Sequence, residues 1–438
     1  MTKDVKLNLN KTLFEKAMEK MKREFKQAKI KITDFILIII LLGLYKKIDA
    51  TQSDIIYIVT DCPDERSPLN YERKTVALHN KLLEQLNNQK NNGKGKSYDW
   101  LINNFIAAYI HTKLSDYTDC IAPLYTIVGY KNQTMQKKTA DAVEKMQLDY
   151  SDMTLVDACC ATGSLFWGLH SHEWKFVILN DLNPLRTNFL SVLQHEPLKL
   201  IKMILGSDLS FIENPDTKNP RLREYKEQLC NYAEKRKNYH KIDRNVEIAY
   251  KMFITQCIDK KQIEKIFNRV LRFLPAHLKM TAANAIITQE DCTAYLKDSP
   301  KIRLSKGNYI TLDANRLLLL DPPYIGTESQ CSVPGYDYGA FHRQAAEYLA
   351  QAKHPFLYYC RSSAPKGSQQ FTEEAKHIMK QKLSDYFFDK GFYFDKVPLD
   401  GGDTTELMIS NKNYAPSDQI LWTNMTDDIF NPNPQTPM

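Results

Sequence analysis

In the first part of this chain, hydrophobic and polar residues follow the spacing of helices. In residues 11–30 apolar side chains recur at helical spacing among charged ones, which predicts an amphipathic helix. A second helical pattern runs from Tyr98 to Leu114. We therefore interpret residues 1–115 as a mostly helical N-terminal extension, in which no recognisable chemistry appears.

One apolar run raises the question of a membrane. The segment FILIIILLGLY, residues 35–45, has eleven apolar residues, whereas a spanning helix needs about 20. It follows a long polar and basic stretch and lacks a small-residue cleavage site, which argues against a signal peptide. We expect a buried element here, and a membrane anchor is the alternative.

The pattern changes in residues 116–200. The strand in MTLVDACCATGS passes through small residues into a helical LFWGLH, and the strand KFVILND leads into a helical PLRTNFLSVLQ. Strands followed by acids return in AIITQEDC and LLLLDPPY, and further strands in FLYYC and ELMIS. Such alternation predicts an α/β fold with a doubly wound parallel sheet. Its two halves are residues 116–200 and 281–413, and residues 414–438 form a C-terminal tail.

The net charge of +7 matters through its location. Residues 201–280 hold 17 Lys and Arg against 10 Asp and Glu, so this helical insert alone carries an excess of +7. A basic insert predicts contacts with nucleic-acid phosphates, and a solvated helical face is the alternative. The positive charge clusters at Lys235, Arg236, Lys237, Lys260, Lys261, Arg269 and Arg272.

The nine cysteines are scattered, odd in number and without a C-x-x-C pair. This arrangement predicts neither a zinc knuckle nor a disulfide framework. A reducing cytoplasm fits it best, and we expect no metal site.

Four acids follow predicted strands. Asp157 ends TLVD, Asp181 ends FVILND, Asp291 follows AIITQE and Asp321 ends LLLLD. Ligands of doubly wound sheets bind beyond the carboxyl ends of the strands. The four carboxylates therefore predict one shared pocket.

Two of the positions near these acids have alternative explanations. Gly163 in VDACCATGS can take a positive φ where a cofactor approaches the backbone, or the segment is simply a tight strand–helix turn. Asp181 lies 24 residues after Asp157, near the distance at which an acid meets ribose hydroxyls. Alternatively, Asp181 or an Asn of NDLNP caps the helix that begins in PLRTNFL.

The segment LLLLDPPY ends a buried run with an acid and two prolines. Proline has no N–H, so Asp321-Pro322-Pro323 offers mainly acceptors: a carboxylate and fixed carbonyls. An amino group with two hydrogens suits them, and Tyr324 offers a flat face on which a base can stack. A strand that ends in a proline turn is the alternative.

From about residue 123 to 413 the chain resembles the Dam-type, alpha-class DNA adenine-N6 methyltransferases, which use S-adenosylmethionine. PLYTIVGYKNQT resembles the family's opening segment, VDACCATGSLF its cofactor loop and NDLNP its N-D-I-N-P. EDCTAYL, LDPPY, FLYYCRSS and TELMISN follow in the family's order. Where the family has an aromatic residue and a glycine in the cofactor loop, this chain has Cys159 and Ala161.

The resemblance implies a Rossmann-like sheet and a role for each matched residue. Asp181 would bind the ribose hydroxyls of the cofactor, and Asp291 its adenine amine. The methionine end would be held by Lys131, Asp157 and Gly163, together with Ile127 where an aromatic residue is usual. Asp321, Pro322, Pro323 and Tyr324 would hold the target adenine, and the insert at 201–280 falls where the family keeps its target-recognition domain.

The first interpretation is thus a site-specific DNA methyltransferase that acts on the N6 amine of a flipped adenine in duplex DNA. A cognate restriction enzyme is a further partner to expect, and a membrane is not. Two alternatives stay open: a methyltransferase for RNA or another exocyclic amine, and a DNA-binding or regulatory module that has lost catalysis.

Overall fold

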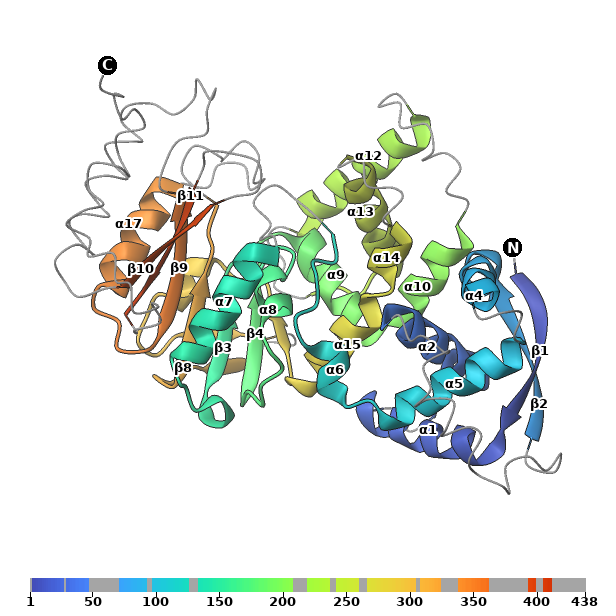
Figure 1. Cartoon of the computed structure of the whole chain (residues 1–438). Helices are drawn as coiled ribbons and strands as arrows, with labels where there is room; N and C mark the ends of the chain where they lie inside the picture. Colours follow the sequence, from blue (N-terminus) through green and yellow to red (C-terminus); the bar gives the residue numbers. More distant parts are fainter. Residues whose placement is uncertain are drawn as a thin grey trace, which may run out of the picture. The chain divides into compact units, whose positions relative to one another are not determined.

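The computed structural model is a mixed α/β protein whose chain forms two compact units (Figure 1). Unit 1 comprises Met1–Leu124, Val192–Glu227 and Arg244–Ala282, and unit 2 comprises Tyr125–Ser191, Gln228–Asp243 and Ala283–Met438. The structure describes residues 2–26, 29–46, 71–92, 97–125, 133–207, 219–236, 242–259, 266–304, 308–323, 338–361, 393–398 and 405–411.

Unit 1 is mainly helical. Its helices are α1 (Lys11–Glu24), α2 (Ile32–Tyr45), α4 (Asn80–Asn92), α5 (Tyr98–His111), α6 (Leu114–Thr118), α10 (Pro197–Gly206), α13 (Val246–Asp259), α14 (Ile266–Val270) and α15 (Phe273–Ala282). Two more, α9 (Pro184–His195) and α12 (Pro220–Arg236), contribute to both units.

The predicted helical extension also contains a β-structure that we did not expect. Strand β1 (Thr2–Asn10) pairs antiparallel with β2 (Tyr71–His79) over nine residues of each. Val5, Leu7 and Leu9 are buried while the residues between them are exposed. This period of two is that of a strand with one buried face.

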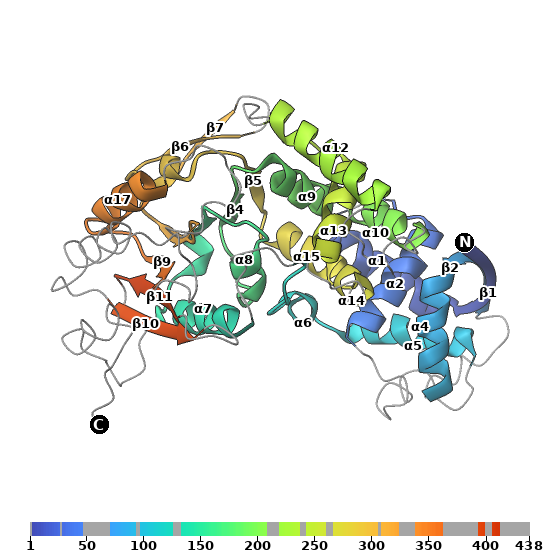
Figure 2. The same ribbon diagram turned by 90° about the horizontal axis from the view of Figure 1, so that it is seen from above.

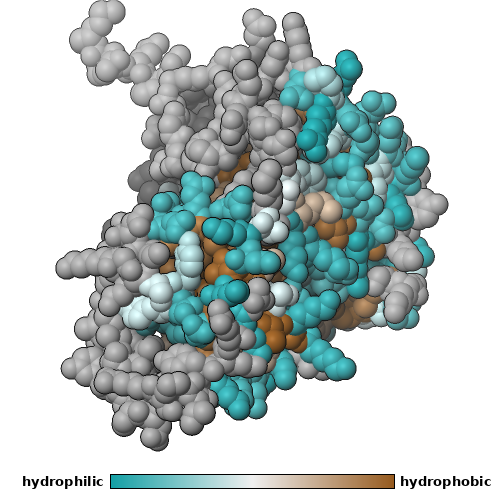
Figure 3. All heavy atoms as spheres, turned by 90° about the vertical axis from the view of Figure 1, so that its right-hand side faces the viewer, coloured by the Kyte–Doolittle hydropathy of each residue, from teal (hydrophilic) through white to brown (hydrophobic). Residues whose placement is uncertain are grey.

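Helix α2 is the buried element expected from the apolar run. Every residue from Phe35 to Leu44 is buried, and Ile32 at its start is 36% exposed. Among the described helices, none has both the length and the apolar content needed to cross a membrane. Hydrophilic residues predominate on the described surface in Figure 3, and hydrophobic ones form smaller areas among them.

The N-terminal extension and the basic insert, predicted as separate segments, pack together within unit 1. Lys202 of the insert forms an ion pair with Asp34 of the extension. Lys26 donates to the Thr281 carbonyl at 2.9 Å, and the rings of Phe25 and His277 lie 5.2 Å apart. This association was not predicted, because residues 116–200 separate the two segments and no local pattern specifies a contact at that distance along the chain.

Unit 2 is built on a seven-stranded sheet with the order β10-β11-β9-β8-β3-β4-β5. Neighbours from β9 to β5 are parallel, whereas β11 is antiparallel to both β9 and β10. The strands are β3 (Thr154–Asp157), β4 (Phe176–Asn180), β5 (Ile286–Thr288), β8 (Arg316–Leu320), β9 (Phe356–Arg361), β10 (Tyr393–Pro398) and β11 (Thr405–Ser410). The short strands β6 (Lys301–Arg303) and β7 (Tyr309–Thr311) form a separate antiparallel pair.

Helices cover both faces of the sheet, as the continuous burial of its central strands requires. Leu318 and Leu320 belong to a core cluster with Phe341 of α17 (Tyr338–Leu349). On the opposite face the Tyr359 hydroxyl is 2.9 Å from the Thr139 hydroxyl of α7 (Gln133–Lys145). Figure 2 shows α17 and α7 on opposite sides of the strands.

The strand order changes direction between β3 and β8. From β3 the chain proceeds outward through β4 to β5, and it then returns to the other side of β3 to form β8 and β9. In doubly wound sheets ligands bind beyond the carboxyl ends of the strands at such a reversal, which here lies between β3 and β8. Asp157 and Asp321 stand at these two strand ends.

Candidate functional site

The turn after β3 has the backbone that its small residues predicted. Asp157 is fully buried at the end of the strand, and Gly163 begins α8 (Ser164–Gly168) with φ +72°. A Cβ at Gly163 would lie 2.7 Å from the Trp167 indole nitrogen, so this position requires glycine on two counts. Ala161 also has a positive φ, of +49°, although it bears a Cβ.

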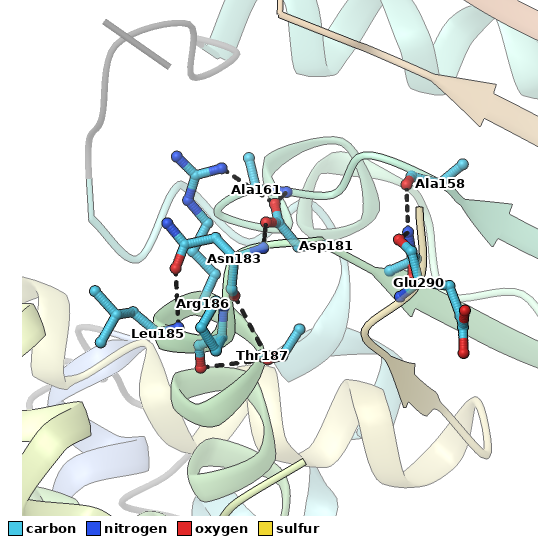
Figure 4. Close-up of polar contacts among 10 residues, drawn as sticks. Ala158, Ala161, Asp181, Asn183, Leu185, Arg186, Thr187 and Glu290 are labelled. Atoms are coloured by element: carbon cyan, nitrogen blue, oxygen red, sulfur yellow. Dashed lines mark hydrogen bonds and ion pairs between the residues drawn. The ribbon is translucent and has the colours of Figure 1, made fainter. Parts of the chain in front are cut away.

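The Asp181 carboxylate fastens this turn to the end of β4 (Figure 4). One oxygen accepts the amide N–H of Ala161 at 2.9 Å and contacts the Arg186 guanidinium at 3.1 Å, and the other accepts the Asn183 amide at 2.7 Å. The cap of α9 is Asn183, whose side-chain oxygen accepts the Leu185 amide at 2.9 Å. The helix cap expected within NDLNP is therefore Asn183, and Asp181 supports that cap by accepting the Asn183 amide.

Asn180, which the sequence analysis did not single out, joins three strand ends. Its side-chain amide donates to the carbonyls of Ala158 and Glu290, at 2.8 and 2.9 Å. Its oxygen accepts the Glu290 amide at 2.9 Å and the Thr288 hydroxyl at 3.0 Å. Because Asn180 is 1% exposed, these bonds hold the carboxyl ends of β3, β4 and β5 in a fixed relation.

Asp291 lies just beyond β5 and is partly exposed. One of its carboxylate oxygens accepts the amide and the hydroxyl of Thr293, at 2.8 and 2.7 Å. It thereby caps the 3₁₀ helix Cys292–Tyr295, which fixes the direction of its side chain.

The proline segment begins where β8 ends. Asp321 and Pro323 are partly exposed, and Pro322 is buried. The Pro323 carbonyl accepts a hydrogen bond from the ring of His342, on α17, at 2.9 Å. Tyr324, Ile127 and Lys131 lie outside the described residues, so their predicted roles stay predictions.

The partly exposed Cys159 and the buried Cys160, in the turn after β3, are affected by the charges of several strand-end acids. The pKa of the Cys159 thiol is raised by a hydrogen bond with Cys292, by burial, and by the negative charges of Asp181 and Asp321. Burial raises the pKa of Cys160, and the neighbouring charges of Asp157 and Asp181 raise it further. The interaction between two charges weakens as the distance between them grows. The acids that end β3, β4 and β8 therefore all lie near the turn that holds Cys159 and Cys160. Asp291 precedes Cys292 directly in the chain.

Two of the basic residues predicted to contact DNA, Lys235 and Arg236, lie at the end of α12. Lys235 is exposed, whereas Arg236 pairs with Asp243 at 2.7 Å. The carbonyl of Arg236 accepts a bond from Gln289 at 3.3 Å, which places this end of α12 beside the loop after β5. Lys237, Lys260 and Lys261 lie outside the described residues.

Arg269 needs a correction, because it serves the interior of unit 1. It is 5% exposed and contacts the Cys257 sulfur at 3.7 Å, so its guanidinium is not available to a phosphate. Arg272 is partly exposed. Burial and the neighbouring Arg269 charge lower its pKa, and its side chain donates to a backbone carbonyl. The phosphate contact predicted for Arg272 stays a prediction.

The comparisons with known proteins add no assignment. The chain matches no protein-family model, and no curated protein matches it. The functional argument therefore depends on the geometry of the strand ends and on the motifs in the sequence.

Proposed function

We propose that the protein is an S-adenosylmethionine-dependent methyltransferase that methylates the N6 amine of adenine in DNA. The observation that carries this proposal is the position of the Asp321-Pro322-Pro323 segment. It follows β8, beside β3, where the strand order reverses and where ligands of doubly wound sheets bind. A segment that offers mainly acceptors at that point suits a substrate amine.

The residues present fit the cofactor. A carboxylate offers about four lone-pair sites, and Asp181 meets three donors, from Ala161, Asn183 and Arg186. Acceptor capacity remains for a ribose hydroxyl. In this proposal Asp157 and Gly163 line the methionine end, together with Lys131 and Ile127, and Asp291 receives the adenine amine. S-adenosylmethionine supplies an activated methyl group on a sulfonium.

The chain's own part in the reaction is to hold the amine. The lone pair of an exocyclic base amine is delocalised into the ring, which makes the nitrogen a poor nucleophile. In the proposed complex the Asp321 carboxylate and the Pro322 carbonyl each accept one amine hydrogen. This favours a pyramidal nitrogen whose lone pair points away from the ring. Catalysis is then positioning plus fixed electrostatic contacts, with the flipped base stacked on Tyr324.

A second candidate, a DNA-binding module without catalysis, is favoured by one observation. Arg186 lies 3.1 Å from the Asp181 carboxylate, so a ribose hydroxyl must share this acid with a guanidinium. Titrating the full-length protein with S-adenosylmethionine in a calorimeter separates the two candidates. The enzyme binds it, and a module that has lost the cofactor site does not.

The direct test is to express the chain in cells that lack adenine methylation and to map methylated adenines in their DNA. We expect N6-methyladenine at a recurring sequence, and none from an Asp321→Ala variant expressed at the same level. Unmethylated DNA together with methylated RNA would contradict the DNA assignment and support the RNA alternative. Unmethylated DNA and RNA would reject the methyltransferase proposal.

A further inference from the structure

The proline segment cannot anchor its own backbone. Pro322 and Pro323 have no N–H, so hydrogen bonds can hold their backbone only at the carbonyls, which need a donor from elsewhere. His342 is such a donor: its Nε2 lies 2.9 Å from the Pro323 oxygen. His342 is 8% exposed and belongs to α17, nineteen positions further along the chain.

The ring of His342 is itself oriented by a second side chain. Its Nδ1 forms a hydrogen bond with the hydroxyl of Tyr358, on β9. Tyr358 is 2% exposed, and burial raises its pKa well above the usual value, with further contributions from Cys360 and Cys159. The phenol therefore keeps its proton at neutral pH and can donate it to the ring.

These contacts define the tautomer. A carbonyl oxygen only accepts, so the bond to Pro323 requires a proton on Nε2 of His342. In a neutral ring Nδ1 is then the acceptor, which matches the Tyr358 hydroxyl as donor. The result is a relay with one direction, from the Tyr358 hydroxyl through His342 to the Pro323 carbonyl.

We propose that His342, oriented by Tyr358, is a positioning residue that sets the direction of the Pro322 and Pro323 carbonyls and so the grip on the substrate amine. This role rests on the proposed function. His342 lies on α17, on the face of the sheet opposite to α7. It bonds to the Pro323 carbonyl, which follows along the backbone the Pro322 carbonyl proposed to accept an amine hydrogen. A small rotation of the Pro322–Pro323 peptide would turn that acceptor away from the amine hydrogen.

Paired variants separate positioning from packing. His342→Leu removes the donor to Pro323, whereas the amide of His342→Gln can reach the same carbonyl. Tyr358→Phe removes the group that orients the ring. Its matched control is Tyr359→Phe, which loses a buried hydroxyl contact to Thr139 on the other face of the same strand.

Transfer is measured with labelled S-adenosylmethionine and adenine-unmethylated bacterial genomic DNA. We expect His342→Leu to lower kcat roughly 10- to 100-fold, the cost of misplacing a reacting group by about 1 Å, with an unchanged Kd for S-adenosylmethionine. His342→Gln should recover most of this loss. Tyr358→Phe should lower kcat, and Tyr359→Phe should leave it near the wild-type value.

A spectroscopic measurement tests the relay without activity. In ¹⁵N-histidine spectra of the full-length protein, the resonance lost in His342→Gln should show a neutral ring with its proton on Nε2. Tyr358→Phe should shift it, and Tyr359→Phe should not. A proton on Nδ1 would overturn the relay.

The two proposals fail differently. Wild-type kcat in both His342 variants, in a protein that methylates DNA, would overturn the positioning role alone. A wild-type protein that binds S-adenosylmethionine but methylates no DNA would overturn the proposed function and the catalytic role of His342 with it. The ¹⁵N measurement of the His342 tautomer would still test whether the hydrogen bonds from Tyr358 through His342 to Pro323 exist.

Discussion

The Asp181 carboxylate, at the end of β4, accepts the backbone amide of Ala161 at 2.9 Å, across twenty positions of the chain. This bond holds the turn after β3 in the conformation in which Ala161 takes a φ of +49°. Asp181, which is proposed to bind the cofactor ribose, thus also stabilises the turn after β3. A change at either residue will affect both stability and the cofactor site.

Asp181→Ala should weaken S-adenosylmethionine binding by roughly 1–3 kcal/mol, the cost of leaving buried polar groups without a partner. The same change leaves the amides of Ala161 and Asn183 without their acceptor, so the free energy of unfolding should also fall. Calorimetric titration at a temperature where the variant is folded separates the two effects. Asp313→Ala, which removes exposed contacts with Lys175 and with the Asn315 amide, is the control and should leave the binding of S-adenosylmethionine unchanged. Normal cofactor binding by a destabilised Asp181→Ala would assign Asp181 to the turn alone.

Ala161→Gly should raise the free energy of unfolding by roughly 0.5–1 kcal/mol. An L-residue with a Cβ is disfavoured in the left-handed region, and the greater freedom of glycine in the unfolded chain cancels only part of the gain. Ala158→Gly is the matched control, because Ala158 is not among the described residues with positive φ and should lose stability. Chemical denaturation of both variants measures the difference, and a loss of stability in both would contradict the explanation.

Asp321→Ala should lower methyl transfer at least ~100-fold, the scale for removing one preorganised electrostatic contact. The affinity for S-adenosylmethionine should stay nearly unchanged, since the proposed cofactor contacts come from other strand ends. Asp321→Asn keeps one acceptor oxygen and should retain more transfer than Asp321→Ala. Single-turnover rates with saturating cofactor would show this order, and near wild-type transfer by Asp321→Ala would refute the role of the acid.

Much of unit 2 follows from local signals in the sequence. Apolar runs that end on an acid predicted β3, β4 and β8. Because these strands are parallel, their carboxyl ends lie at one edge of the sheet, and so do Asp157, Asp181 and Asp321. Gly163 was predictable because a sharp strand–helix turn of small residues needs a positive φ.

The partners of these residues were not predictable, because long-range packing chooses them. Asn180 bonds to Glu290 across 110 positions, and nothing near it in the sequence specifies that contact. Arg272 was counted as a surface charge, yet its acceptor is the Pro123 carbonyl, 149 positions away. Charge composition records how many cations a segment has, and only the packed core determines which of them turn inward.

Acid should destabilise the protein through His277. Burial lowers the pKa of His277 to about 4 from the ordinary 6.5, so between these pH values the unfolded chain binds a proton that the folded one does not. The free energy of unfolding should therefore fall as pH drops from about 6.5 to about 4, by up to roughly 3 kcal/mol.

The control for this pH dependence is His277→Asn, whose amide can keep the bond to the Gln194 carbonyl but cannot be protonated. Denaturant unfolding at a series of pH values should give it a smaller slope. A residual slope is expected, because burial also lowers the pKa of His354 to about 4. An identical slope in the wild type and the variant would exclude His277 as the cause.

The predicted DNA contact is best tested at Lys235. It is exposed at the end of α12, which Gln289 ties to the loop after β5 through the Arg236 carbonyl. Each phosphate contact contributes about 0.9 to the slope of log affinity against log salt. Lys235→Ala should therefore flatten that slope by about one contact, measured by DNA binding at several salt concentrations. Arg236→Ala should flatten it less, because Asp243 already neutralises the guanidinium, and Arg269→Ala should reduce stability and leave the slope unchanged. An unaltered slope in Lys235→Ala would move the DNA contact away from α12.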